Sequence, residues 1–78
     1  MLKITLYTRP DCHLCEQAAE LLAYVLDEAM YDIKEVDISE SDDLLGKYGE
    51  KIPVLKQLED GAELYWPFDD ELLERFLS

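Results

Sequence analysis

The sequence predicts an α/β fold, namely a four-stranded mixed sheet with three helices in the order β-α-β-α-β-β-α. The spacing of apolar residues supports this order, because it changes repeatedly between the two-residue period of strands and the longer period of helices. A strand, a helix and a strand in succession predict a parallel pair joined by a right-handed crossover. The turn sequence Asp60-Gly61 predicts an antiparallel hairpin. The sheet therefore contains both kinds of pairing.

The first strand and the first helix fill the N-terminal part of the chain. Apolar and polar residues alternate over residues 2–6, which predicts a strand with one wetter face, and Pro10 ends it. From about Cys12 to Met30 the apolar residues follow a helical period, and Asp11 occupies the position of an N-cap. The apolar face of this longest helix consists of Leu14, Ala18, Leu21, Leu22, Val25 and Ala29.

The middle of the chain predicts a second strand and a short helix. Residues 31–38 carry β-branched side chains between charged neighbours, a pattern typical of a strand. Residues 39–42 are helix-start residues, and Gly49 is a typical helix stop. We therefore expect a short helix whose apolar side chains are Leu44, Leu45 and Tyr48.

A hairpin and a final helix complete the expected fold. Residues 52–55 begin the third strand, residues 59–61 form the turn, and residues 62–66 return as the fourth strand. Asp69 occupies the cap position of the last helix. The apolar face of that helix consists of Leu72, Leu73, Phe76 and Leu77.

Length and charge limit the class of protein. Seventy-eight residues suffice for one domain, which we expect to span residues 1–78. Hydrophobic residues make up 49% of the chain, which is enough for a core. Nineteen acidic residues against seven basic ones give a formal charge of −12. This charge disfavours nucleic acids and anionic membrane surfaces as partners.

The apolar segments are too short for membrane insertion or secretion. A bilayer span takes about 20 apolar residues, and the apolar start of this chain is also too short for a signal peptide. We therefore expect a cytoplasmic protein. Two cysteines are too few for a disulfide framework, and in a reducing compartment their Cys-x-x-Cys spacing indicates a catalytic or metal-binding pair.

The segment Cys12-His13-Leu14-Cys15 carries the strongest chemical signal. A thiolate is the nucleophile in disulfide exchange, and a helix N-terminus lowers the pKa of a thiol because its free N–H groups favour an anion. A spacing of three residues places the second cysteine one turn deeper on the same helix face. We therefore expect Cys12 to attack a substrate disulfide and Cys15 to resolve the mixed disulfide.

Charged neighbours of the pair act in opposite directions. Arg9 offers a positive charge three residues before Cys12, and His13 offers a charge or a hydrogen bond. Asp11 and Glu16 flank the pair, and negative charges raise a thiol pKa. We expect the helix terminus and Arg9 to prevail because they act at contact range.

Two other classes of function remain open. The same cysteines are possible ligands of a metal ion or of an iron–sulfur cluster shared in a dimer, although the sequence holds no second cysteine pair to complete a zinc site. Alternatively, the domain is a non-catalytic interaction module. Metal bound to the purified protein would identify the first alternative, and a binding function that survives Cys12→Ser would identify the second.

Residues 7–15, together with residues 52–55, resemble a glutaredoxin, and in particular the short bacterial glutaredoxin-like proteins of the thioredoxin superfamily. The resemblance covers nearly the whole chain and implies a thioredoxin-like fold. It implies that Pro53 follows a cis bond and lies against the cysteine pair. It also implies that the main chain of Ile52 pairs with a substrate peptide or glutathione, and that Arg9 contacts the glutathione carboxylate.

The chain departs from the glutaredoxin pattern at two places. His13-Leu14 replaces the usual Pro-Tyr between the cysteines, which removes one wall of the glutathione groove. Trp66-Pro67 stands where the family has two glycines that let the substrate backbone approach. Trp66 is therefore expected as a groove wall, and Asp69 fits the position at which the family's last helix begins.

These observations together predict a glutaredoxin-like thiol–disulfide oxidoreductase that acts in cell redox homeostasis. The expected substrate is a disulfide-containing protein or a small thiol compound, with glutathione as a candidate co-substrate. The expected site consists of Cys12 and Cys15 as reacting residues, with Arg9, His13, Ile52, Pro53, Trp66 and Asp69 around the substrate. We expect a monomer without an organic cofactor or a metal, because the cysteine pair itself carries the electrons.

Overall fold

The computed structural model describes residues 2–27 and 29–77. Glu28, which lies within the helix expected from the sequence, is outside the described residues. Met1 and Ser78, the ends of the expected domain, are outside them as well.

The described part of the chain contains four strands and three α-helices in the order that the sequence predicts. The strands are β1 (Leu2–Thr8), β2 (Tyr31–Asp37), β3 (Val54–Gln57) and β4 (Glu63–Tyr65). The helices are α1 (His13–Val25), α2 (Asp42–Tyr48) and α3 (Asp70–Leu77), and a 3-10 turn, η1 (Ile38–Glu40), precedes α2.

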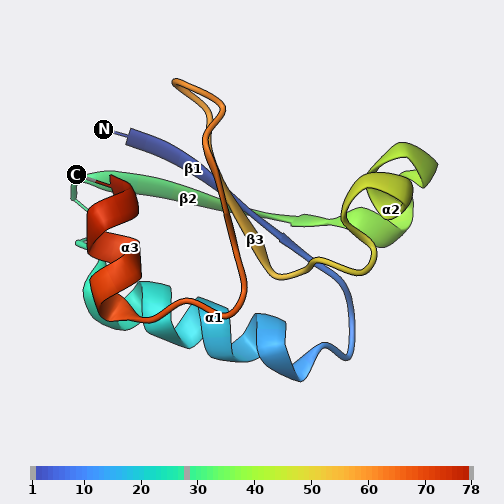
Figure 1. The fold of residues 1–78 in the computed structure, drawn as a ribbon, viewed down its shortest axis with the longest axis horizontal. Helices are drawn as coiled ribbons and strands as arrows, with labels where there is room; N and C mark the ends of the chain where they lie inside the picture. The colour runs from blue at the N-terminus through green and yellow to red at the C-terminus, as the bar shows by residue number, and fades with distance from the viewer. Residues whose placement is uncertain (1, 28, 78) are drawn as a thin grey trace.

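The strands form one mixed sheet in the order β2-β1-β3-β4 (Figure 1). β1 pairs with β2 in parallel, with Thr8 opposite Asp37. β1 also pairs antiparallel with β3, with Tyr7 opposite Val54, and β3 continues antiparallel to β4. The expected α/β class with a four-stranded mixed sheet is therefore confirmed.

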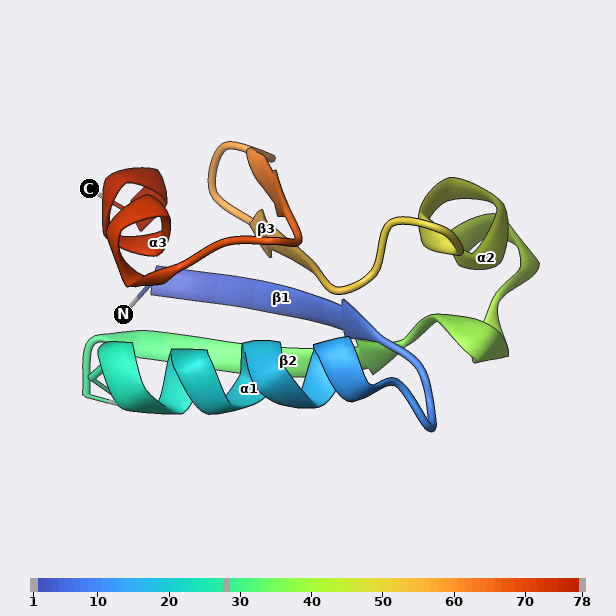
Figure 2. The ribbon, with the colours of Figure 1, turned by 60° about the horizontal axis from the view of Figure 1, so that its bottom comes forward.

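Helices cover the two faces of the sheet unequally. One face packs against α1 and α3, and its buried core consists of Ile4, Leu6, Ala18, Leu22, Leu55, Phe68 and Leu73. A smaller buried cluster of Ile38, Tyr48 and Val54 joins the opposite face to α2. Figures 1 and 2 show α2 at one end of the molecule, apart from α1 and α3. In the part of the chain that is described, no helix has the length and apolar character needed to cross a membrane.

Helix α1 ends earlier than its apolar period suggests. It ends at Val25, and the following residue, Leu26, has an extended backbone with φ −94° and ψ 138°. The Asp27 side chain accepts a hydrogen bond of 2.9 Å from the N–H of Ala29. Such a local bond gives the backbone an alternative to the helix. The expected continuation to Met30, with Ala29 on the apolar face, was therefore wrong.

The strand boundaries differ by one or two residues from those expected. β2 ends at Asp37 because Ile38 enters the 3-10 turn, and β3 begins at Val54, after Pro53. β4 covers residues 63–65 rather than 62–66.

Several residues contradict the expected burial. Leu14, expected on the apolar face of α1, is 45% exposed. Thr5, on the expected wetter face of β1, is only 5% exposed, because it lies in the register between Lys34 and Lys56 of the two flanking strands. Leu72, expected on the apolar face of α3, is 43% exposed, whereas its neighbour Leu73 is fully buried.

Candidate functional site

The two cysteines lie at the start of α1 and form a disulfide, with their Cα atoms 5.2 Å apart. Cys12 is the N-cap of α1, with φ −105° and ψ 103°. Asp11, expected as the cap, lies one residue earlier and has a left-handed backbone with φ 59°. Aspartate tolerates this conformation better than most residues do. The turn at Asp11 therefore brings the sulfur of Cys12, rather than the carboxylate, to the helix end.

A backbone hydrogen bond joins the two cysteines. The N–H of Cys15 donates to Sγ of Cys12 over 3.1 Å, which is the contact that a capping side chain makes. The carbonyl of Cys12 in turn accepts from the N–H of Glu16 over 3.1 Å. When the disulfide is reduced, an N–H in this position stabilises a thiolate at Cys12, as does the positive end of the helix dipole.

The two sulfur-bearing residues differ in exposure. Cys12 is half-buried, whereas Cys15 is only 5% exposed and belongs to the buried residues of α1. A large substrate therefore reaches Cys12 more readily than Cys15. This difference is what an attacking and a resolving cysteine need.

Arg9 and both cysteines line an open hollow of about 220 Å³. Its charged lining residues are Arg9, Asp11, Glu16 and Glu35. Near the hollow, the pKa of Asp37 is lowered, first by hydrogen bonds from the hydroxyl and the N–H of Ser39 and then by the charge of Arg9. Arg9 therefore lies in one hollow with the cysteine pair, and its charge also acts on Asp37.

The His13 side chain lies beside a neighbour on its own helix. Its Nδ1 lies 3.7 Å from Oε2 of Glu16, and its side chain is 93% exposed. A protonated imidazole in this place forms an exposed ion pair, which contributes little to stability. The structure thus places His13 at the rim of the site.

Pro53 and Ile52 lie at the sheet edge from which the cysteine loop departs. β1 ends at Thr8 and β3 begins opposite Tyr7, so the residues before β3 and the loop after β1 share this edge. The Ile52–Pro53 peptide bond is cis, and Pro53 is fully buried. The N–H of Ile52 donates to the carbonyl of Tyr48 over 3.1 Å, so a ligand that uses this donor must displace that bond.

Trp66 lies beside Pro53 on the neighbouring chain segment. Its N–H donates to the carbonyl of Pro53 over 3.2 Å, which extends the β3–β4 pairing by one bond. Its half-buried indole meets the ring of Phe68 edge-on, with 5.0 Å between centroids. Trp66 therefore joins the core edge to the segment around Pro53, and its expected place as a groove wall stays a prediction.

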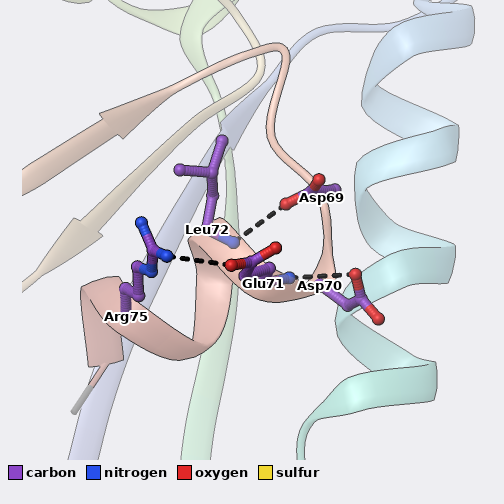
Figure 3. A network of polar contacts seen from close by, with 5 residues as sticks. All are labelled: Asp69, Asp70, Glu71, Leu72 and Arg75. Carbon is purple, nitrogen blue, oxygen red and sulfur yellow. Dashed lines mark hydrogen bonds and ion pairs between the residues drawn. The ribbon is translucent and has the colours of Figure 1, made fainter.

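Asp69 caps α3. Its Oδ1 accepts from the N–H of Leu72 over 2.9 Å, and its carbonyl accepts from the N–H of Leu73 over 2.9 Å. Figure 3 shows this cap beside the Oδ1 of Asp70, which accepts from the N–H of Glu71. The predicted cap is therefore present, and the expected contact of Asp69 with a substrate stays a prediction.

A cluster of tyrosines around Glu63 was not foreseen as a unit. The hydroxyls of Tyr48 and Tyr65 both donate to the Glu63 carboxylate, the latter over 2.8 Å. The ring of Tyr48 also stacks on Tyr7, with 4.4 Å between centroids. Burial and Glu63 raise the pKa of Tyr48, whereas the phenol of Tyr48 lowers the pKa of Glu63. These residues come from three elements, β1, α2 and β4, so no local sequence pattern predicts the cluster.

Potential metal ligands are dispersed in this structure. Over residues 2–27 and 29–77, histidine, cysteine, aspartate and glutamate side chains do not gather in groups of three that could hold a metal ion.

Comparison with known proteins places the chain among glutaredoxin-like sequences. The model of the family described as "Glutaredoxin-like domain (DUF836)" matches residues 3–78. The uncharacterized protein Rv0508 of Mycobacterium tuberculosis is 31% identical over 77 residues, which cover 91% of this chain and 77% of that protein. The uncharacterized protein Mb0520 of Mycobacterium bovis matches with the same values.

Solved structures show the same fold. The X-ray structure of protein XcR50 from X. campestris superimposes with a TM-score of 0.83 at 42% identity, covering 95% of this chain and 93% of that chain. The solution structure of protein Ne2328 from Nitrosomonas europaea gives a TM-score of 0.82 at 26% identity, covering 99% and 92%.

Proposed function

Because this chain belongs to the glutaredoxin-like domain (DUF836) family, we propose that it is a thiol–disulfide oxidoreductase in which Cys12 attacks and Cys15 resolves. The observation that carries the proposal is the hydrogen bond of 3.1 Å from the N–H of Cys15 to Sγ of Cys12. It places the more exposed sulfur at a helix N-terminus, where an anion is favoured.

The reaction starts from the reduced pair. The Cys12 thiolate attacks one sulfur of a substrate disulfide, so that a new S–S bond forms and the other substrate sulfur leaves as a thiolate that takes a proton from water. Cys15 then loses its proton and attacks Sγ of Cys12, which releases the second substrate sulfur as a thiolate that takes up a proton in turn. The substrate gains two electrons and two protons, and the protein is left with the Cys12–Cys15 disulfide.

A donor of two thiol groups returns the protein to its reduced state by the same exchange steps in reverse: either one dithiol protein, which is left as a disulfide, or two molecules of a monothiol, which are left joined as a disulfide. Glutathione or a thioredoxin-type reductase is suited to this role. Neither an organic cofactor nor a metal enters the sequence of steps, because the two sulfurs exchange the electrons directly.

The surroundings of the pair support a protein disulfide or a small-thiol disulfide as the substrate. The main chain beside Pro53 and the indole of Trp66 lie at the edge of the sheet that carries the cysteine loop. We propose that these groups hold the substrate segment next to Cys12, while Arg9 attracts a carboxylate such as that of glutathione.

The decisive experiment measures the reactivity of each sulfur separately. In metal-free Cys15→Ser protein, we expect the Cys12 thiolate to titrate by ultraviolet absorbance with a pKa below about 7. The unaltered protein should reduce insulin disulfides, and Cys12→Ser should abolish this activity. Cys15→Ser should instead accumulate a mixed disulfide with the substrate. A pKa at or above about 8.5 together with inactive protein would refute the proposal.

A further inference from the structure

The sheet face opposite α1 and α3 is only partly covered. Ile4 and Leu6 point into the core with α1 and α3, whereas Tyr7, of the other parity in β1, packs with Tyr48 of α2. Because successive side chains of a strand point to opposite faces, Lys3 and Thr5 share the face of Tyr7. Helix α2 stands at one end of this face, which we call the open face (Figures 1 and 2).

Three lysines project from the strands of the open face. The register places Lys34 of β2 and Lys56 of β3 on either side of Thr5 in β1. Lys3 precedes Thr5 by two residues in β1 and so points to the same face. Neighbouring strands are about 4.8 Å apart, so Lys34 and Lys56 start about 10 Å from each other. Lys3 and Lys34 are exposed, and Lys56 is half-exposed.

Two further lysines reach the open face from α2 and the turn after it. Nζ of Lys47 lies 5.2 Å from the ring centroid of Tyr48, and Nζ of Lys51 lies 5.6 Å from that of Tyr65. The charges of Lys47 and Lys56 both help to lower the pKa of Glu63. Lysines from the strands and from α2 therefore converge around the tyrosine cluster.

Basic residues are concentrated on this face of an otherwise acidic chain. Five of the seven basic residues gather here, although the formal net charge is −12. The four strands contribute the carboxylates of Asp32 and Glu63 to this face, and α2 and the turn after it carry Asp42, Asp43 and Glu50 as well as their two lysines. Glu63 already accepts hydrogen bonds from Tyr48 and Tyr65, so much of its charge is engaged inside the protein.

We propose that the open face binds an acidic segment of a partner polypeptide. The lysines supply charge complementarity, and Tyr65, a residue that is 42% exposed, supplies a flat apolar contact between them. The proposal goes beyond the redox function, because this contact needs neither cysteine.

Size favours a short acidic segment over a nucleic acid. The molecule measures 31 × 25 × 18 Å, so a longer polyanion runs past the open face and meets the acidic remainder of the surface. Repulsion acts over about 8 Å at physiological salt, which such a strand cannot avoid. A second copy of this chain is also disfavoured as the partner. Its acidic surface against the open face would be a contact between two different faces, and such a head-to-tail contact does not close into a dimer.

The test uses a fluorescein-labelled oligoglutamate peptide of about eight residues, whose extended length of about 27 Å matches the face. Fluorescence anisotropy should show that the peptide binds the unaltered protein at low salt. The double variant Lys34→Gln/Lys56→Gln should weaken binding by about fivefold or more, because it removes two charge contacts. Circular dichroism checks that the variant is folded.

The matched control is Gln17→Glu/Tyr24→Glu on the exposed side of α1, which gives the same net charge of −14 as the lysine variant. It should change peptide affinity less than twofold. Equal weakening by the two variants, or no binding to the unaltered protein, overturns the proposal. It is also overturned if single-stranded DNA or anionic vesicles bind more tightly than the peptide, or if sedimentation shows self-association that the lysine variant abolishes.

Discussion

Arg9 is an exposed charge that lies near both the cysteine pair and Asp37. It lines the hollow beside the cysteines, and its charge also lowers the pKa of Asp37. An exposed charge in water acts weakly at each partner, so its effect on the thiolate is modest beside that of the N–H donated by Cys15.

Replacing Arg9 should therefore raise the thiolate pKa by a small amount. In the Cys15→Ser background, we expect Arg9→Gln to raise the pKa of Cys12 by about 0.1–0.7 units, measured by thiolate absorbance. Arg75→Gln, which removes a charge from α3, is the matched control and should leave this pKa unchanged. An unchanged or lowered pKa in Arg9→Gln would contradict the role given to Arg9.

Glu63 should make stability depend on acid. The pKa of Glu63 is lowered in the fold, chiefly by the hydrogen bond from Tyr48. Its contribution is therefore present above its ordinary pKa of 4.5 and is lost as the pH falls through the lowered value. We expect Glu63→Gln to reduce the free energy of unfolding by about 1 kcal/mol at neutral pH and by less at pH 3, measured by urea denaturation.

The exposed turn residue Glu59 provides the control for this pH dependence. Glu59→Gln should leave the difference in unfolding free energy between neutral and acid pH as it is in the unaltered protein. If Glu63→Gln lowers the free energy of unfolding by the same amount at both pH values, the tyrosine hydrogen bonds do not favour the charged carboxylate.

At the scale of elements, Asp69 is expected to act through α3. It holds the N–H of Leu72, so Asp69→Ala should lower the free energy of unfolding by about 1 kcal/mol in urea denaturation. Asp70→Ala, which removes a carboxylate bonded only one residue ahead, should cost less. Insulin reduction per folded molecule should stay constant in Asp69→Ala, and a selective loss of turnover would instead assign Asp69 to the substrate.

The sequence allows the type and order of the elements to be predicted, but their ends less well. The apolar period of α1 continues to Ala29, yet the Asp27 side chain bonds the backbone and the helix ends at Val25. At the other end, both Asp11 and Cys12 could cap the helix, and the left-handed turn at Asp11 decides between them. The spacing of apolar residues does not reveal where a side chain competes for backbone hydrogen bonds, so it does not predict where a helix ends.

At the scale of the whole molecule, a chain this short has little stability to lose. Two adjacent leucines of α3 allow the effect of burial on stability to be measured apart from that of helix propensity. The two residues are of the same type in the same helix, but Leu73 is fully buried and Leu72 is 43% exposed. We expect Leu73→Ala to lower the free energy of unfolding by about 2–4 kcal/mol and Leu72→Ala by less than about 1 kcal/mol in urea. Similar costs would show that α3 does not anchor the core as described.

Long-range packing explains which parts of the site the sequence could reveal. Cys12 and Cys15 lie within one turn, so their spacing predicts their contact. The Tyr48–Glu63–Tyr65 cluster and the lysines of the open face depend on strand register and on the position of α2. A single sequence contains no record of that register, so these features became visible only in the folded chain.

The cap at Cys12 ties the redox state of the protein to its folding. The same sulfur that exchanges electrons also accepts the N–H of Cys15, one of the N–H groups in the first turn of α1 that have no partner within the helix. If the folded chain stabilises the Cys12 thiolate, the reduction potential of the Cys12–Cys15 disulfide rises. By the same free energy, the reduced protein becomes more stable against unfolding. Changes that loosen the first turn of α1 should therefore make the disulfide harder to reduce, even where they touch no substrate.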